Sequence, residues 1–299
     1  MPYKKIKIDE VKNLKAYDVL FKNGFSKSKS QQLIDKGRLF CNEKLIQIKN
    51  EILNGEIFLI DYECNSKGLK PIFQSDEFVV FDKPSGVLSH PNGRSTKYSL
   101  YDEIWSLYPK SACVAHRLDK ETSGLIIVSL SQSVSKKFKT MFENRVVKKE
   151  YIALVYGKVE NEFTIDAGIS KSDKFSEVKI KMRIDENGKR AITKFIPLEF
   201  YPKFNATLIK AIPFTGRQHQ IRLHLFHVKH KIFGEPLYGL ETKVVEDIMD
   251  EKLCVQDRIK FCGANRLCLH ANKLNFIYDG KEYEITSKTD IKTEFLNSI

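Results

Sequence analysis

The sequence predicts an α+β protein in which a small ααβ unit precedes a larger, β-rich domain. The chain has 299 residues, more than one domain of about 150 residues requires. From residue 71 onward, short strand-like apolar runs are joined partly by tight turns and partly by helical stretches. Regular βαβ alternation is missing, which argues against a parallel sheet. The expected parts are a flexible tail at residues 1–12, the small unit at 13–63, a linker at 64–72 and the large domain at 73–299.

The small unit is predicted from helix caps and turn residues. Residues 1–12 are polar and are expected to be loose, like most chain ends. Apolar residues from Leu14 favour a short helix that ends at Gly24, and a second helix is capped by Ser26 or Ser28. The expected strands are residues 38–41, 44–46 and 57–60.

The large domain is predicted as strands interrupted by helices, with a tight turn at Asn187-Gly188. The expected strands are residues 78–81, 125–130, 151–156, 178–184, 191–198 and 206–212, with a last pair near 267–277. The expected helices are residues 100–107, 133–144 and 218–228. Residues 241–253 resemble an acidic amphipathic helix, interpreted as a surface insertion packed onto the sheet.

The composition excludes several classes of protein. Hydrophobic residues make up 42% and charged residues 29%, which excludes disordered and collagen-like chains. No apolar stretch approaches the roughly 18 to 20 residues of a membrane span, and no signal-peptide pattern is visible, so a cytoplasmic protein is expected. The 6 cysteines lack CxxC or metal-type spacing, which argues against a disulfide framework and a zinc site.

The positive charge is concentrated in particular segments. The formal net charge is +12, and residues 181–231 hold 11 Lys and Arg against 3 Asp and Glu. Residues 1–70 hold 14 against 9, whereas residues 232–260 hold 4 against 7. A basic excess confined to two segments is typical of a protein that binds nucleic acid.

The segment HRLDKETSGL at residues 116–125 is the sharpest candidate for chemistry. Its charged turn ends at Gly124, which leads directly into an apolar strand, so the loop is held by a buried element. Such loops commonly present catalytic groups. The alternative is an ordinary turn in which Asp119 bonds backbone amides.

Three other segments carry weaker signals. In TGRQHQIRLH, residues 215–224, Thr215 and Gln218 form a capping-box pattern, which starts a helix there and puts Arg217 in its first turn, where anions are favoured. This histidine-rich helix lacks a metalloprotease HExxH pattern, which disfavours metal. KPSG at residues 83–86 is no nucleotide-binding fingerprint. KKEYIALV at residues 148–155 puts Tyr151 on a strand, where a packed aromatic is the simpler reading.

In this order, KPSG, HRLDKETSGL, KKEYIALVYG and TGRQHQIRLHL resemble the RluA family of RNA pseudouridine synthases over about residues 73–285. The N-terminal unit resembles the S4 RNA-binding domain that precedes many members. The resemblance implies a mixed, mainly antiparallel β-sheet with flanking helices, the pseudouridine synthase fold. Two departures are Gly234-Glu235, where the family commonly has Gly-Asp, and a tail after Ile285 without a Pro-rich ending. Both lie away from the catalytic loop in sequence and concern the specificity surface.

The resemblance also implies a reaction and a set of residues. Uridine within RNA is isomerised without a redox cofactor, metal or ATP. Asp119 is implied as the essential carboxylate, which attacks C1′ or uracil C6 or assists loss of the base. Arg217 suits the role of its ion-pair partner. Tyr151 matches the tyrosine that stacks on uracil and takes up the C5 proton.

RNA is the implied partner, with 23S ribosomal RNA as the first expectation and transfer RNA as the alternative. A uridine in folded RNA must be flipped out, and Arg117 is placed to fill the gap. The other expected RNA contacts are Lys27, Lys29 and Arg38 of the S4-like unit, His116 and Arg222. No membrane or metal partner is expected, and a monomer suffices for this chemistry.

Two other classes of function remain as alternatives. A non-catalytic RNA-binding protein would show the same basic segments, although binding alone gives no reason for the trio of Asp119, Tyr151 and Arg217. A glycoside hydrolase would need two carboxylates flanking one bond, which Asp119 and Glu121 on one tight loop rarely achieve. Product analysis separates these classes, because they yield pseudouridine, unchanged RNA or hydrolysed sugar.

Overall fold

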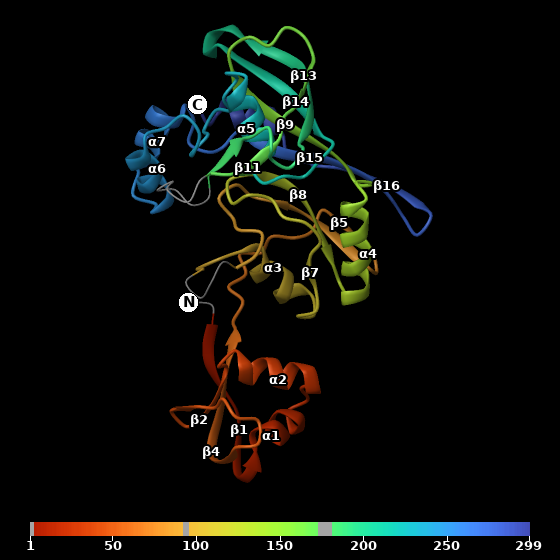
Figure 1. The fold of residues 1–299 in the computed structure, drawn as a ribbon, viewed down its shortest axis with the longest axis vertical. Coiled ribbons are helices and arrows are strands. Elements are labelled where there is room, and N and C mark those ends of the chain that lie inside the picture. The colour runs from red at the N-terminus through yellow and green to blue at the C-terminus, as the bar shows by residue number, and fades with distance from the viewer. Residues whose placement is uncertain (1–2, 92–95, 173–180) are drawn as a thin grey trace. The chain divides into compact units, whose positions relative to one another are not determined.

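The structure, a computed structural model, describes residues 3–91, 96–172 and 181–299. The chain forms two compact units, one of Met1–Lys67 with Pro91–Ser106 and one of Gly68–His90 with Leu107–Ile299 (Figure 1). The first boundary falls inside the expected linker at 64–72. The segment after Pro91 was expected in the large domain, but it groups with the first unit.

Side chains of helix α3 (Leu100–Leu107) explain this grouping. The buried carboxylate of Asp102 accepts hydrogen bonds from the Tyr62 hydroxyl at 2.6 Å and from the Asn65 amide at 2.8 Å. Glu103 accepts from the Lys67 amide at 2.6 Å. These carboxylates satisfy backbone donors that a free linker would leave to water.

The first unit contains a four-stranded sheet in the order β1-β4-β2-β3 and two helices. Its elements are β1 (Tyr3–Lys15), α1 (Ala16–Lys22), α2 (Lys27–Asp35), β2 (Leu39–Cys41), β3 (Lys44–Leu45) and β4 (Ile52–Tyr62). Helix α2 begins after Ser26, one of the two predicted caps, whose hydroxyl accepts from the Lys29 amide. Apolar residues of both helices and of β4 form one core.

The prediction of a flexible tail at residues 1–12 is wrong for residues 3–12, which the structure describes. From Tyr3 onward the chain pairs antiparallel with β4, in a register that runs from Tyr3 opposite Tyr62 to Lys15 opposite Ile52. The strand is hard to recognise in the sequence because only Val11 along it is buried, so no apolar alternation marks it. Its stability comes from backbone hydrogen bonds to β4.

The second unit is built on a mixed sheet in the order β10-β13-β14-β9-β15-β8-β6-β5, which β16 and β7 extend at β15 and β8. β15 and β8 pair in parallel, whereas the other neighbours are antiparallel. The strands are β5 (Phe73–Gln74), β6 (Phe78–Lys83), β7 (Cys113–Val114), β8 (Ser123–Ser129), β9 (Lys148–Tyr156), β10 (Phe163–Asp166), β13 (Ile192–Tyr201), β14 (Ala206–Pro213), β15 (Leu269–Tyr278) and β16 (Lys281–Thr286). The predicted α+β class is confirmed.

Helices and a smaller strand pair flank this sheet (Figure 1). They are α4 (Gln132–Glu143), β11 (Ile169–Lys171), β12 (Met182–Ile184), the 3₁₀ turn Pro202–Phe204, α5 (Gln220–His227), α6 (Thr242–Met249), α7 (Val255–Cys262) and α8 (Ile291–Leu296). Helix α4 buries Val134 and Phe138 against the sheet. Residues 178–180 of the expected strand at 178–184 lie outside the described residues, and its end forms β12. No helix in the described part of the chain is long and apolar enough to span a membrane.

The acidic segment at 241–253 contains the predicted amphipathic helix, α6. Its buried residue Val245 packs into a cluster with Leu223 of α5, Leu237 and Ile169 of β11. The insertion therefore covers α5 and the small strand pair. Helices α7 and α8 and the full length of β16 were not predicted, because their short apolar patterns fall below what periodicity can distinguish.

Candidate active site

Four residues on neighbouring strands define one level of the sheet. Gly124 on β8 lies opposite Ala271 on β15, Ala271 lies opposite Tyr151 on β9, and Tyr151 lies opposite Ala211 on β14. Gly124 has a positive φ of 112°, and a β-carbon there would lie 2.3 Å from the Ala271 carbonyl oxygen. Glycine is therefore required for β8 to approach β15, which brings the loop before it to the level of Tyr151.

The loop that carries Asp119 is held by the KPSG segment, residues 83–86, and by Ser89. The Ser85 hydroxyl donates to the Glu121 carbonyl at 2.6 Å, and the Ser89 hydroxyl donates to the Leu118 carbonyl at 2.7 Å. The buried ammonium of Lys83 donates to the Lys120 carbonyl at 3.2 Å. Both carbonyls flanking Asp119 are thus fixed, which keeps the position of its carboxylate well defined.

Asp119 belongs to a chain of buried ion pairs. Its Oδ2 lies 3.0 Å from Nη1 of Arg222, and Nη2 and Nε of Arg222 contact the Glu235 carboxylate at 2.6 and 2.8 Å. The side chains of Arg222 and Glu235 are 4% and 1% exposed, whereas that of Asp119 is 30% exposed. The chain of charges therefore ends at a carboxylate that reaches the surface of the site.

The structure corrects the prediction that Arg217 pairs with Asp119. Arg217 lies before the helix, and its Nε donates to the Arg190 carbonyl at 3.2 Å. The helix begins at Gln220, two residues later than the expected start at residue 218, and the Gln220 side chain accepts from the Thr215 hydroxyl at 2.7 Å. The later start turns Arg222 inward, so Arg222 also cannot serve as the surface RNA contact that was expected.

His219 occupies the position before α5 in the left-handed conformation, with φ 55°. Its Nδ1 lies 3.0 Å from the Tyr238 hydroxyl, and its Nε2 lies 3.8 Å from Oδ2 of Asp119. Burial, reinforced by the charge of Arg222, lowers the pKa of His219 to about 4, so the ring is neutral at neutral pH. A non-glycine residue with a left-handed backbone beside a buried ion pair is typical of functional sites.

The electrostatics keep Asp119 ionised. Burial raises its pKa, but the charge of Arg222, with smaller contributions from His219 and Lys83, outweighs burial and holds the pKa below its usual value. Burial lowers the pKa of Lys83 to about 7. Burial and the negative charge of Asp119 raise the pKa of Tyr151, whose hydroxyl is therefore protonated at neutral pH.

The residues near this site that were expected to contact RNA differ in exposure and in charge. Arg117 is exposed beside the loop, with Nη1 3.1 Å from Nε2 of His90. His116 is turned inward, where its Nε2 accepts from the Ile127 amide at 3.1 Å. Burial and then Lys149 lower its pKa to about 3, so His116 carries no charge for a phosphate.

In the first unit, the three expected contacts differ in their surroundings. Lys27 and Lys29 are exposed on α2. Arg38 is partly buried, with its guanidinium 4.8 Å from the ring centre of Tyr3. The two lysines keep their ammonium groups available to an anion.

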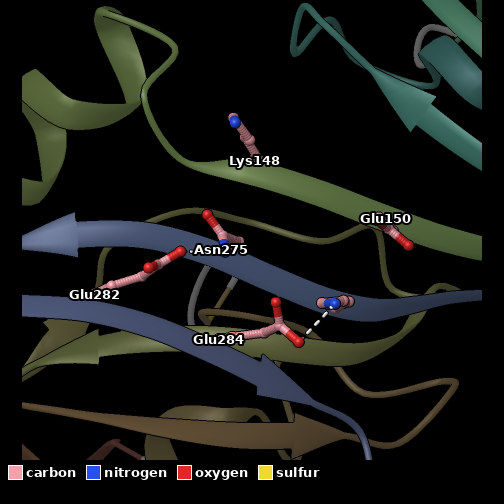
Figure 2. A pocket seen from close by; sticks show the side chains of 6 residues that line it. Lys148, Glu150, Asn275, Glu282 and Glu284 are labelled. Atoms are coloured by element: carbon pink, nitrogen blue, oxygen red, sulfur yellow. Dashed lines mark hydrogen bonds and ion pairs between the residues drawn. The ribbon is translucent and has the colours of Figure 1, made fainter.

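Two hollows are lined by charged residues, and neither lining includes Asp119 or Tyr151. One, of about 250 Å³, lies between the loop that carries Asp119 and helices α6 and α7, where Arg258 binds Glu121 at 2.5 Å and Lys120 binds Glu251 at 2.8 Å. The other, of about 230 Å³, lies on β9, β15 and β16 and includes Lys148 (Figure 2). Among the described residues, no group of His, Cys, Asp and Glu has the arrangement of a metal site.

Sequence reasoning missed Glu235, His219 and the supporting role of KPSG. Glu235 was noted only as a departure remote from the catalytic loop, and the structure corrects this, because Glu235 holds the partner of Asp119. It also accepts from the Leu237 amide at 2.9 Å. Its departure from the family pattern was the available signal, but only the fold connects it to Asp119.

Comparisons with known proteins agree with this geometry. The RNA pseudouridylate synthase family profile matches residues 77–227. An uncharacterized RNA pseudouridine synthase of Helicobacter pylori strain J99 is 37% identical over 88% of this chain and 87% of its own length. Ribosomal large subunit pseudouridine synthase C of Haemophilus ducreyi is 34% identical over 69% of this chain and 60% of its own. The structure of human RNA pseudouridylate synthase domain containing 1 has the same fold, with a TM-score of 0.59, 24% identity, and coverage of 76% of this chain and 86% of that one.

Proposed function

The chain belongs to the RluA-type RNA pseudouridylate synthase family, and we propose that it isomerises specific uridines in structured RNA with Asp119 as the reacting carboxylate. It is therefore an RNA pseudouridine synthase, an isomerase that acts on RNA. The observation that carries the proposal is the pairing of a partly exposed Asp119 with the buried Arg222 at the level of Tyr151. In this arrangement Arg222 pairs with the buried Glu235 and with Asp119, and Asp119 is the ionised carboxylate that a substrate can reach.

In the proposed reaction, the bond between C1′ and N1 of uridine breaks, uracil turns, and a bond forms between C1′ and C5. The proton on C5 is lost and one proton is gained at N1, so atoms and electrons balance. Asp119 acts as a nucleophile, or it assists departure of uracil as a glycal forms. Both routes require an ionised carboxylate, which the charge of Arg222 favours.

Tyr151 and Arg117 are proposed to handle the flipped nucleotide. The Tyr151 ring is buried on the sheet and fits a role as the surface against which uracil stacks, and its hydroxyl is proposed to take part in moving the C5 proton. Arg117 is exposed beside the catalytic loop and fits the gap that the flipped base leaves in the RNA. Neither role needs a cofactor.

We propose ribosomal RNA of the large subunit, 23S rRNA, as the substrate, with action in the cytoplasm. The proposal is supported by relatives named ribosomal large subunit pseudouridine synthases. Residues 13–63 are proposed to be an S4-like RNA-binding unit, in which the exposed Lys27 and Lys29 contact phosphates. Transfer RNA is the alternative substrate, and a monomer suffices for the chemistry.

The test is tritium release from RNA labelled at uridine C5. Unmodified 23S rRNA and transfer RNA transcripts are incubated with wild type and with Asp119→Ala. Release by wild type alone supports both the reaction and the role of Asp119, and the RNA that responds identifies the substrate class. Retained RNA binding without release from either transcript would favour a non-catalytic RNA-binding protein.

A further inference from the structure

Lys149 lies on the catalytic face of β9, although the mechanism above does not use it. Side chains alternate along a strand, so Lys149 shares a face with Tyr151 and lies one strand repeat, roughly 7 Å, from it. Lys148 and Glu150 point to the opposite face, where Figure 2 shows them beside the groove on β15 and β16. The consecutive residues Lys148 and Lys149 therefore point to opposite faces of the sheet.

The surroundings of the Lys149 ammonium are neutral. Its Nζ lies 3.6 Å from the position that a β-carbon on Gly216 would occupy and 5.9 Å from the ring centre of Phe142. The ring of His116, uncharged because of its low pKa, packs on Phe142 with ring centres 4.7 Å apart. In the described part of the chain, no carboxylate contacts Lys149.

Lysines on the opposite face of the sheet, unlike Lys149, have carboxylate partners. There Lys210 faces Glu150 at 3.7 Å, and Lys273 binds Glu284 at 2.7 Å. Burial without a partner lowers the pKa of Lys149, which is the cost of keeping a cation among neutral groups. An anion brought by the substrate would offset that cost.

The position fits one part of an RNA substrate. With uracil against Tyr151 and the sugar at Asp119, one strand repeat is comparable to the distance between the sugar and the phosphate of a nucleotide. Because Gly216 has no side chain, nothing from that residue blocks an approach to the ammonium. We propose that Lys149 is a phosphate-binding residue of the active site, which contacts the phosphodiester next to the target uridine and fixes its register. This proposal rests on the proposed function.

The experiment measures kcat and KM at several salt concentrations, using whichever of the 23S rRNA and transfer RNA transcripts the wild type modifies. Lys149→Ala is expected to raise KM about tenfold with kcat changed less than about twofold. Its plot of log kcat/KM against log salt should be shallower by about 0.7 to 0.9, the effect of one lost phosphate contact. Lys149→Arg should restore both values, because it keeps the charge.

Lys148→Ala is the matched control, since it removes a neighbouring lysine from the opposite face and should keep the wild-type salt slope. If Lys149→Ala fails to fold, an RNA oligonucleotide with one neutral methylphosphonate beside the target uridine replaces it, and wild type should show the same rise in KM with that oligonucleotide. An unchanged KM and slope, or a fall in kcat alone, would overturn the phosphate assignment. A wild type that forms no pseudouridine would refute the proposed function instead.

Discussion

Replacing Arg222 by methionine should both destabilise the protein and raise the pKa of Asp119. A nearby arginine typically lowers the pKa of an aspartate by about 1–3 units, each worth about 1.4 kcal/mol. The 3.0 Å contact with a guanidinium that is only 4% exposed belongs to this class. Without Arg222, burial acts on Asp119 with much less compensation, so its pKa rises above the ordinary value of about 3.9.

The sign of the pH effect follows from this shift. In wild type, the pKa of Asp119 lies below its ordinary value, so the carboxylate stays ionised and its contribution is lost only as pH falls through that low value. In Arg222→Met, the acid limb of kcat/KM should therefore move up by about 1–3 pH units. Loss of positioning should reduce kcat/KM at neutral pH by about 100-fold as well.

Arg217→Met is the matched control, since it removes an arginine from the same peptide without touching Asp119. Its acid limb should coincide with that of wild type. Leaving Glu235 buried without its arginine should cost about 3–5 kcal/mol in urea unfolding, and the double variant Arg222→Met/Glu235→Met should recover most of it without recovering activity. Equal losses for the two arginine variants, or an acid limb that stays in place, would refute the reasoning.

Three further predictions concern the same site and the first unit. Asp119→Ala should leave less than about 1% of wild-type turnover while RNA binding is retained, which tritium release and filter binding would measure. Tyr151→Phe keeps the ring and should lower kcat by about 10²–10⁴ through loss of the hydroxyl, with KM nearly unchanged; an unchanged kcat would assign Tyr151 to stacking alone. Gly124→Ala should destabilise the protein by about 2–4 kcal/mol in urea unfolding, because its β-carbon meets the Ala271 carbonyl at a positive φ; wild-type stability would contradict this.

The sequence predicted those features that depend on local pattern. The serine cap of α2 and the glycine at the start of β8 depend on neighbouring residues; the cap is Ser26, one of the two serines expected, and Gly124 lies where the sequence predicted it. The strand that starts at Tyr3 was missed because its stability comes from pairing with β4, whose paired residues lie 37 (Lys15 with Ile52) to 59 (Tyr3 with Tyr62) positions away in sequence. A strand with so few buried side chains has no alternation of apolar and polar residues, so its pairing with a distant strand cannot be predicted from its sequence.

The prediction of Arg217 failed for a different physical reason. A capping-box pattern at Thr215 is a local signal, and it placed Arg217 in the first helical turn. In the structure, Gln220 takes the Thr215 hydroxyl, and His219 adopts a left-handed backbone that delays the helix. Because one helical residue turns the direction of a side chain by about 100°, a shift of two residues decides which arginine faces the core.

The ion pairs around Asp119 also change how Glu235 is interpreted, the residue that stands where the family commonly has aspartate. In the sequence alone, Glu235 stands 13 residues after Arg222, and its replacement of the family's usual aspartate was interpreted as a matter of specificity. In the fold, Glu235 binds Arg222 through both carboxylate oxygens, and Arg222 binds Asp119. A single buried guanidinium between two carboxylates must divide its charge between them, so the strength with which Glu235 holds Arg222 sets how strongly Asp119 is kept ionised. Glu235 is therefore connected through Arg222 to Asp119, although the two carboxylates are far apart in the sequence.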